Sequence, residues 1–287
     1  MIQNPAALSF FDVIDRPAGL VRRSFRALYP IALFGSLVGV IPGVIQQLGM
    51  AAPGSDPTQV LGFAALVYGM AFVALLVWAV TMLAVFDGIR RVVDGEPAGI
   101  VPCYRRALRP RALGSLVLPG IAMGAGWLMC CLPGVVLSVL FAFLAPIIVH
   151  ENPPPLQVMG RSADLVLRGS PRGVLPVLGV MLVGLLVTYA IQSIHTLPAM
   201  VLGFMVGFSQ IATGEMTDPG QVQGRLAWIN VATSVVAAFV VPVGYLYVAS
   251  ALTTMYRKTR EQRDGADLER ALEARLAGAA HDGPESP

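Results

Sequence analysis

The arginines are the side chains of this sequence with the clearest chemistry, because a guanidinium group offers five N–H donors that match a phosphate group. Many of them lie next to long apolar runs, where a lipid headgroup would meet them. We expect seven to bind anionic lipid headgroups: Arg22, Arg23, Arg105, Arg106, Arg109, Arg161 and Arg168. Two alternatives stay open. The arginines only fix the orientation of the chain in the membrane, or those near Asp164 form the solvated face of an amphipathic helix.

His150 and Glu151 follow an apolar run directly and form a second candidate site. One interpretation is a proton or metal site, but a metal needs three or four converging ligands and none is visible in the sequence. The other is a solvated helix end at which Glu151 pairs with an arginine such as Arg161. We favour the second interpretation and expect no metal and no cofactor.

The spacing patterns of common catalytic sites do not occur in this sequence. It contains no H-E-x-x-H, no G-x-S-x-G, no Walker A motif and no paired carboxylates inside an apolar run. Cys130 and Cys131 are interpreted as small apolar residues rather than as a redox or lipidation site, and with Cys103 they predict no disulfide. We therefore predict no catalytic residue. Ionisable residues are scarce inside the apolar runs, which argues against an ion-coupled carrier.

Long apolar runs must position these side chains. The chain of 287 residues is 55% hydrophobic and only 13% charged, whereas a soluble domain carries about 25% charged residues. One run of 38 residues without a charge, from Ala112 to Val149, is long enough for two short crossings of a bilayer. Leu132-Pro133-Gly134 marks a turn near its middle. We predict a helical hairpin with arms at 112–131 and 134–150.

The whole pattern predicts an all-α polytopic transmembrane helix bundle with about six spans. The expected parts are an amphipathic interfacial segment at 1–26, a six-span domain at 27–256 and a cytoplasmic tail at 257–287. Spans are expected at 27–48, 60–86, 112–131, 134–150, 173–194 and 226–255. The apolar segment 196–213 is predicted to be a re-entrant or surface helix on the outer side, because a further crossing would separate the basic tail from the other basic loops.

Charge asymmetry predicts the orientation of the spans. Nineteen of the twenty Lys and Arg residues lie in the segments on one side, and only Arg225 lies on the other. By the positive-inside rule, both termini are expected in the cytoplasm. On that side we predict amphipathic interfacial helices in the first 26 residues, where Pro17 should break or kink the helix, around 101–108 and over 156–167. The basic segments lack the interleaved aromatic residues of a nucleic-acid site, so no nucleic acid is expected.

Two stretches carry a resemblance to a known family. One is Leu8-Ser9-Phe10 followed by Val13-Ile14-Asp15-Arg16, and the other is Ala145 to Glu151 followed by an RSxxLVxG-like helix from Arg161 to Gly169. They resemble motifs of a bacterial family of six-helix membrane proteins built on the membrane domain of glycerophosphoryl diester phosphodiesterase. The matching residues are Asp15, Arg16, Glu151, Arg161, Ser162, Leu165 and Gly169. The resemblance implies a multi-pass protein of the bacterial inner membrane. It implies no phosphodiesterase activity here, because a short tail stands where some members carry the soluble enzyme.

These observations lead to one expected function and one alternative. We expect a non-enzymatic integral inner-membrane protein that acts as a scaffold or partner subunit in envelope or lipid homeostasis. Its expected partners are anionic phospholipids and either a second protein or a second copy of the chain. The alternative is a transporter or lipid-handling membrane protein, which the prolines inside the spans and the segment 196–213 favour.

Overall fold

The structure is a computed structural model, and it describes residues 10–50, 57–129, 131–168, 174–213, 219–265 and 272. These residues form nine helices and no strand: α1 (Phe10–Met50), α2 (Pro57–Val93), α3 (Ile100–Ala107), α4 (Pro110–Met129), α5 (Cys131–Leu140), α6 (Leu144–His150), α7 (Pro155–Arg168), α8 (Leu175–Thr213) and α9 (Pro219–Asp264). Five helical segments are long and apolar enough to cross a membrane. The predicted all-α, multi-span fold is therefore confirmed, and the remaining expected span coincides with α4.

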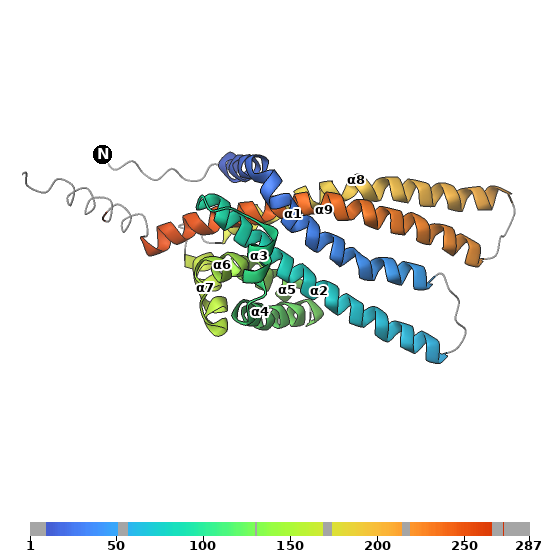
Figure 1. Ribbon diagram of the computed structural model, residues 1–287, viewed down its shortest axis with the longest axis horizontal. Helices are drawn as coiled ribbons and strands as arrows, with labels where there is room; N and C mark the ends of the chain where they lie inside the picture. Colours follow the sequence, from blue (N-terminus) through green and yellow to red (C-terminus); the bar gives the residue numbers. More distant parts are fainter. Residues whose placement is uncertain are drawn as a thin grey trace, which may run out of the picture.

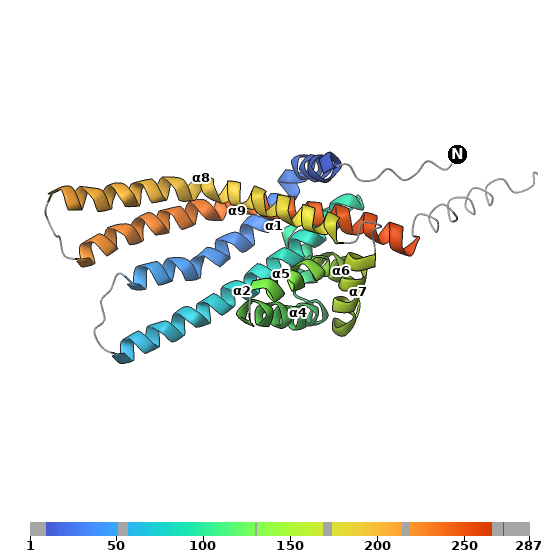
Figure 2. The same cartoon turned by 180° about the vertical axis from the view of Figure 1, so that it is seen from behind.

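Four long helices form a row in the order α8, α9, α1, α2 (Figures 1 and 2). They contain 41, 37, 39 and 46 residues in α1, α2, α8 and α9. At about 1.5 Å per residue, each is roughly 55–70 Å long, about twice the thickness of a bilayer's hydrocarbon core. Each long helix therefore extends well beyond the hydrocarbon core.

The short helices α3 to α7 gather beside one half of this row (Figure 1). α3 and α6 pack on α2, while α7 packs against α4, α5, α6 and α9. The helices predicted around 101–108 and 156–167 are present as α3 and α7, and α7 begins at Pro155. Gly169, the expected end of that helix, lies outside the described residues.

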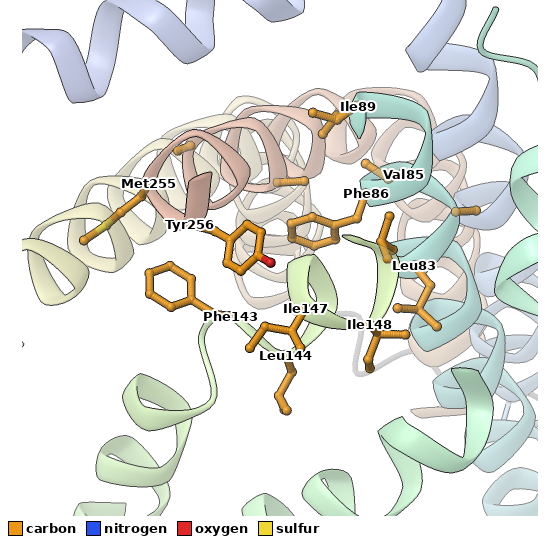
Figure 3. Close-up of a cluster of buried hydrophobic side chains, with 14 of the residues drawn as sticks. Leu83, Val85, Phe86, Ile89, Phe143, Leu144, Ile147, Ile148, Met255 and Tyr256 are labelled. Carbon is orange, nitrogen blue, oxygen red and sulfur yellow. The ribbon is translucent and has the colours of Figure 1, made fainter. Parts of the chain in front are cut away.

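The hydrophobic core lies at this same end of the molecule. It joins α1, α2, α6, α7 and α9, and Figure 3 shows the rings of Phe86, Phe143 and Tyr256 close together in it. The opposite halves of the long helices expose large apolar side chains such as Tyr68 and Phe204. Tight packing is thus concentrated where the charged residues lie, and the apolar surface faces outward elsewhere, as lipid contact requires.

The segment 196–213 does not form the separate re-entrant or surface helix that the sequence suggested. α8 continues without interruption from Leu175 to Thr213 and contains Pro198. A proline removes one backbone donor, and a neighbouring helix lets the main helix continue past it. α9 packs along α8 and supplies that neighbour. Because α8 and α9 run the length of the row, the start of α1 and the end of α9 lie at the same end of the molecule (Figure 1).

The expected fourth span is divided into two helices. α5 ends at Leu140, residues 141–143 form a turn, and α6 begins at Leu144. Ser162 of α7 donates a hydrogen bond of 2.8 Å to the carbonyl oxygen of Leu140. This contact satisfies a carbonyl that the break exposes. The hairpin turn also comes earlier than predicted, since α4 ends at Met129 and Pro133 lies in the first turn of α5, where proline is tolerated.

Two predicted boundaries fall inside continuous helices. Pro17 does not end α1, which runs on through positions 26 and 27. The first part of α1 nevertheless crosses the long axis of the molecule, and the rest runs along that axis (Figures 1 and 2). The boundary between 256 and 257 likewise lies within α9.

Candidate functional site

Asp87 is the centre of the polar site at the core end of the molecule. It lies near the end of α2, and its side chain is only 1% exposed. Its Oδ1 lies 3.2 Å from Nε of Arg90 and 3.4 Å from Nε of Arg106, and its Oδ2 lies 2.8 Å from Nε of Arg91. Three guanidinium groups thus surround one buried carboxylate.

Two exposed carboxylates extend this network toward α9. Glu96 lies 3.3 Å from Nη2 of Arg90 and 3.5 Å from Nη1 of Arg91. Asp94 lies 3.2 Å from Nη1 of Arg90 and 3.5 Å from Nη1 of Arg257. The pair between Asp94 and Arg257 joins the ends of α2 and α9, which are far apart in the sequence.

α3 is held beside this site by the side chains of Arg106 and Tyr104. Arg106 also donates from Nη2 to the carbonyl oxygen of Val149 at 2.9 Å, which connects α3 to α6. Burial lowers the pKa of Arg106, and the charge of Asp87 opposes that change. Burial raises the pKa of the Cys103 thiol and of the Tyr104 hydroxyl. Tyr104 donates to the carbonyl oxygen of Ile31 at 2.9 Å, so α3 also holds α1.

Glu151 forms a second cluster between α6, α7 and α9. Its Oε1 accepts a 2.7 Å hydrogen bond from the hydroxyl of Tyr256, and its Oε2 lies 3.3 Å from Nε of Arg161. Nε of Arg260 lies 3.7 Å from Oε1. The expected pairing of Glu151 with Arg161 is therefore present, and the same carboxylate also binds α9.

His150 is the last residue of α6 and lies beside Tyr256. Its Nε2 atom is buried and has no hydrogen-bond partner among the described residues, and its ring lies 5.3 Å from that of Tyr256. No group of three or more His, Cys, Asp or Glu side chains in the described part of the chain is arranged to hold a metal ion.

The seven arginines proposed for lipid headgroups fall into two sets. Arg106 and Arg161 are partly buried and form the ion pairs with Asp87 and Glu151. The others are exposed at the same end of the molecule: Arg22, Arg23, Arg105, Arg109 and Arg168. Arg168 lies 3.8 Å from Asp164 on the surface of α7. Only the second set presents guanidinium groups mainly to the surroundings.

The remaining described motif residues lie either on the surface near the start of α1 or in the packed core. Asp15 and Arg16 are exposed near the start of α1, whereas Leu165 is fully buried in the core. Ser162 is buried as well and bonds to the break after α5. The side chains of Cys130 and Cys131 lie outside the described part of the structure.

Asp87 and Tyr256 were not predicted from the sequence as site residues. Asp87 ends a long apolar run and precedes arginines at positions i+3 and i+4, the spacing that brings side chains together on a helix. That local signal was available. No local signal could have identified Tyr256, because its partner Glu151 is more than a hundred positions away.

Comparison with known proteins identifies no match to this chain. The chain matches no model of a protein family, no curated protein and no solved structure. The function must therefore be inferred from the geometry of the site. Its main feature is two carboxylates, each paired with several arginines, at one end of a multi-span helical membrane protein.

Proposed function

We propose that this chain is a non-enzymatic scaffold or partner subunit of a membrane rich in anionic lipid. The observation that supports the proposal is that Asp87 and Glu151 are both held by several cationic or hydroxyl donors. A general acid must carry a proton and a general base must be free to accept one. Carboxylates occupied in this way instead join the ends of helices, here α2, α3, α6, α7 and α9.

The exposed arginines support the lipid part of the proposal. Each basic residue near an anionic surface contributes about 1 kcal/mol to attraction. The basic end of the bundle faces the cytoplasm in this proposal, in agreement with the positive-inside rule. The resemblance to the six-helix bacterial family supports a location in the inner membrane, for which phosphatidylglycerol and cardiolipin are the expected lipid partners.

A lipid-handling protein is the second candidate function. It is favoured by the prolines inside the long helices, at positions 30, 42, 198 and 242. A protein that moves lipid must release it, whereas a scaffold retains it, so lipid exchange between vesicles separates the two functions.

The structural role of Glu151 gives the test. Tyr256→Phe should lower the free energy of unfolding by about 1–3 kcal/mol for the lost hydrogen bond. Glu151→Gln keeps an acceptor for Tyr256 but loses the charge paired with Arg161, so it should lower the free energy of unfolding as well. Neither change is expected to affect any turnover of lipid. Tyr247→Phe on the same helix is the matched control, because its buried hydroxyl has no partner among the described residues. Purified protein in phosphatidylglycerol nanodiscs that hydrolyses or transfers lipid, and loses this activity in folded Glu151→Gln, would contradict the proposal.

The partner-subunit part needs its own measurement. Tagged protein isolated from its native membranes in mild detergent should carry a constant stoichiometry of a second protein or of a second copy. Isolation as a monomer with no retained protein, under conditions that preserve other membrane complexes, would contradict a role as partner subunit.

A further inference from the structure

The outward face of α3 carries two large apolar side chains and one arginine. Val101, Arg105 and Leu108 are spaced at i, i+4 and i+7, so they lie on one side of the helix and of the residue that caps it. Val101 is 76% exposed, Leu108 is 55% exposed, and Arg105 is exposed between them. Cys103 and Ala107 form the opposite, buried face. α3 therefore packs against the protein with one face and presents a second, partly apolar face to its surroundings.

Contacts with α2 place α3 at the level where the apolar part of that long helix ends. α2 has no charged residue from position 57 to position 86, and Asp87 is its first charge. The hydroxyl oxygens of Tyr104 and Thr81 lie 3.2 Å apart. Nε of Arg106 lies 3.4 Å from Oδ1 of Asp87. α3 thus lies beside the last uncharged turns and the first charged turn of α2. In a membrane-spanning helix, such a transition marks the boundary between hydrocarbon and headgroups.

α9 indicates the same level from another part of the bundle. It has no charged residue from position 226 to position 256, and Arg257 follows. Nη1 of Arg257 lies 3.5 Å from Oδ1 of Asp94, which directly follows α2. Because this ion pair joins the two helices beyond their uncharged runs, both runs end near one common level. A bilayer that covers the uncharged runs would therefore have its surface at α3.

The charge of this segment suits an anionic surface. Residues 98–111 contain four arginines and no acidic residue. Arg106 is paired with Asp87, whereas Arg105 forms no ion pair with a carboxylate in the described part of the chain. An arginine at a membrane boundary lays its methylene groups along apolar surface and extends its guanidinium group to the phosphates. Arg105, which lies between two exposed apolar side chains, has the surroundings that this conformation requires.

We propose that the outward face of α3 lies in the hydrated headgroup layer of an anionic bilayer, with Arg105 at the lipid phosphates and Val101 and Leu108 against the glycerol level. The occupant of this face is the bilayer surface, and no single lipid needs to be enclosed. The inference rests on the lipid contact of the proposed function and deepens it, because it assigns that contact to one helix face. Water and a second copy of the chain are the other possible occupants, and each gives a different result in the test.

Fluorescence quenching measures what covers this face. Single cysteines at Val101, Leu108 and Gln262 would carry a dye, in a background with the three native cysteines replaced by serine. Gln262 is the control, since it is exposed near the end of α9, which projects beyond the short helices (Figure 1). The purified full chain would be reconstituted into vesicles of phosphatidylglycerol and phosphatidylcholine. Iodide would serve as the quencher in water, and a nitroxide on the lipid headgroup as the quencher in the membrane surface.

The dyes at positions 101 and 108 should be quenched more strongly by the headgroup nitroxide than the dye at position 262, and iodide should give the reverse order. With the nitroxide on either lipid, position 108 should show a preference for phosphatidylglycerol. Arg105→Gln should lower that preference about fivefold, which corresponds to about 1 kcal/mol for one basic residue near an anionic surface. Arg23→Gln removes the same charge from an exposed position on α1 and should lower it less than about twofold, because salt screens distant charges. Circular dichroism would confirm that each variant is folded.

Four outcomes would overturn the assignment, and they leave different conclusions. Quenching at positions 101 and 108 that matches position 262 would place the face in water, so the inference would fail while the proposed function stands. Protection of both positions from both quenchers would show that a second copy of the chain covers the face. Equal effects of Arg105→Gln and Arg23→Gln would show a diffuse basic surface. Absence of any preference for phosphatidylglycerol in the unmodified protein would overturn both the inference and the lipid part of the proposed function.

Discussion

A buried carboxylate at the end of an apolar helix needs compensating charge, because desolvating an unpaired ion costs several kcal/mol. Asp87 meets that need with two guanidinium groups from the next turn of its own helix and one from α3. Arg106 in turn depends on Asp87, since its own burial disfavours the charged form. The carboxylate and its arginines therefore stabilise one another. Removing one of these groups leaves the desolvation cost of the others uncompensated.

Asp87→Asn should destabilise the protein strongly. The substitution keeps the size of the side chain but removes the buried carboxylate that Arg106, Arg90 and Arg91 share. Breaking a buried ion pair costs about 3–5 kcal/mol. Unfolding in mixed micelles by a denaturing detergent would measure it. Glu96→Gln is the matched control, because Glu96 contacts Arg90 and Arg91 from an exposed position and should cost less than about 1 kcal/mol. Equal effects of the two substitutions would remove Asp87 from the centre of the site.

At the scale of the elements, close contacts decide how the long helices fit together. α1 meets α2 at Gly35, where an added Cβ would overlap the side chain of Thr81. Thr81 cannot easily move, since it donates to the carbonyl oxygen of Val77 at 2.7 Å and lies 3.2 Å from the hydroxyl of Tyr104. The glycine thus allows α1, α2 and α3 to share one hydrogen-bonded contact.

Gly35→Ala should separate α1 from α2 and lower the free energy of unfolding by about 1–3 kcal/mol, the usual cost of overpacking. Gly39→Ala, one turn later on the same helix, is the control because nothing lies within 4 Å of its added Cβ. That variant should be neutral or more stable by up to about 1 kcal/mol, since alanine favours helix over glycine. Both variants would be compared by thermal unfolding in detergent. A neutral Gly35→Ala would show that the helices do not approach as closely as described.

At the scale of the whole molecule, the row of four long helices places polar and apolar regions at opposite ends. The network of Asp87 and Glu151, the short helices and both ends of the described chain lie at one end (Figures 1 and 2). The other end consists of the starts of α2 and α9 with the ends of α1 and α8. A bilayer that covers the exposed apolar halves would leave the basic end at one membrane surface.

Labelling of single cysteines should reveal this arrangement. In a background with Cys103, Cys130 and Cys131 replaced by serine, cysteines at Val101, Gln157 and Gln262 should react with an impermeant maleimide from one side only. Cysteines at Pro57 and Pro219 should react from the opposite side. Pro57 and Pro219 begin α2 and α9, and the first three residues lie in α3, α7 and the end of α9. Labelling of position 262 from the same side as position 57 would contradict an arrangement in which the four long helices lie side by side and each runs from one end of the molecule to the other.

The sequence by itself determined the helical class, the multi-span character and the places of α3 and α7. Those features depend on local quantities: the length of uncharged runs, the periodicity of apolar residues and the position of Pro155. It also predicted that Glu151 pairs with Arg161, because the two residues are near each other in the chain. Such features do not depend on how distant segments of the chain pack.

Only the tertiary structure decided which arginines are internal and which face outward. Arg105 and Arg106 are neighbours of identical chemistry, yet only Arg106 points toward Asp87, because α3 docks on α2 with one face. The continuity of α8 past Pro198, beside α9, likewise appears only in the folded chain. The contact of Tyr256 with Glu151 likewise requires α9 to return to the end where α6 stops. Each of these outcomes depends on a partner distant in the sequence, and local propensity carries no information about such a partner.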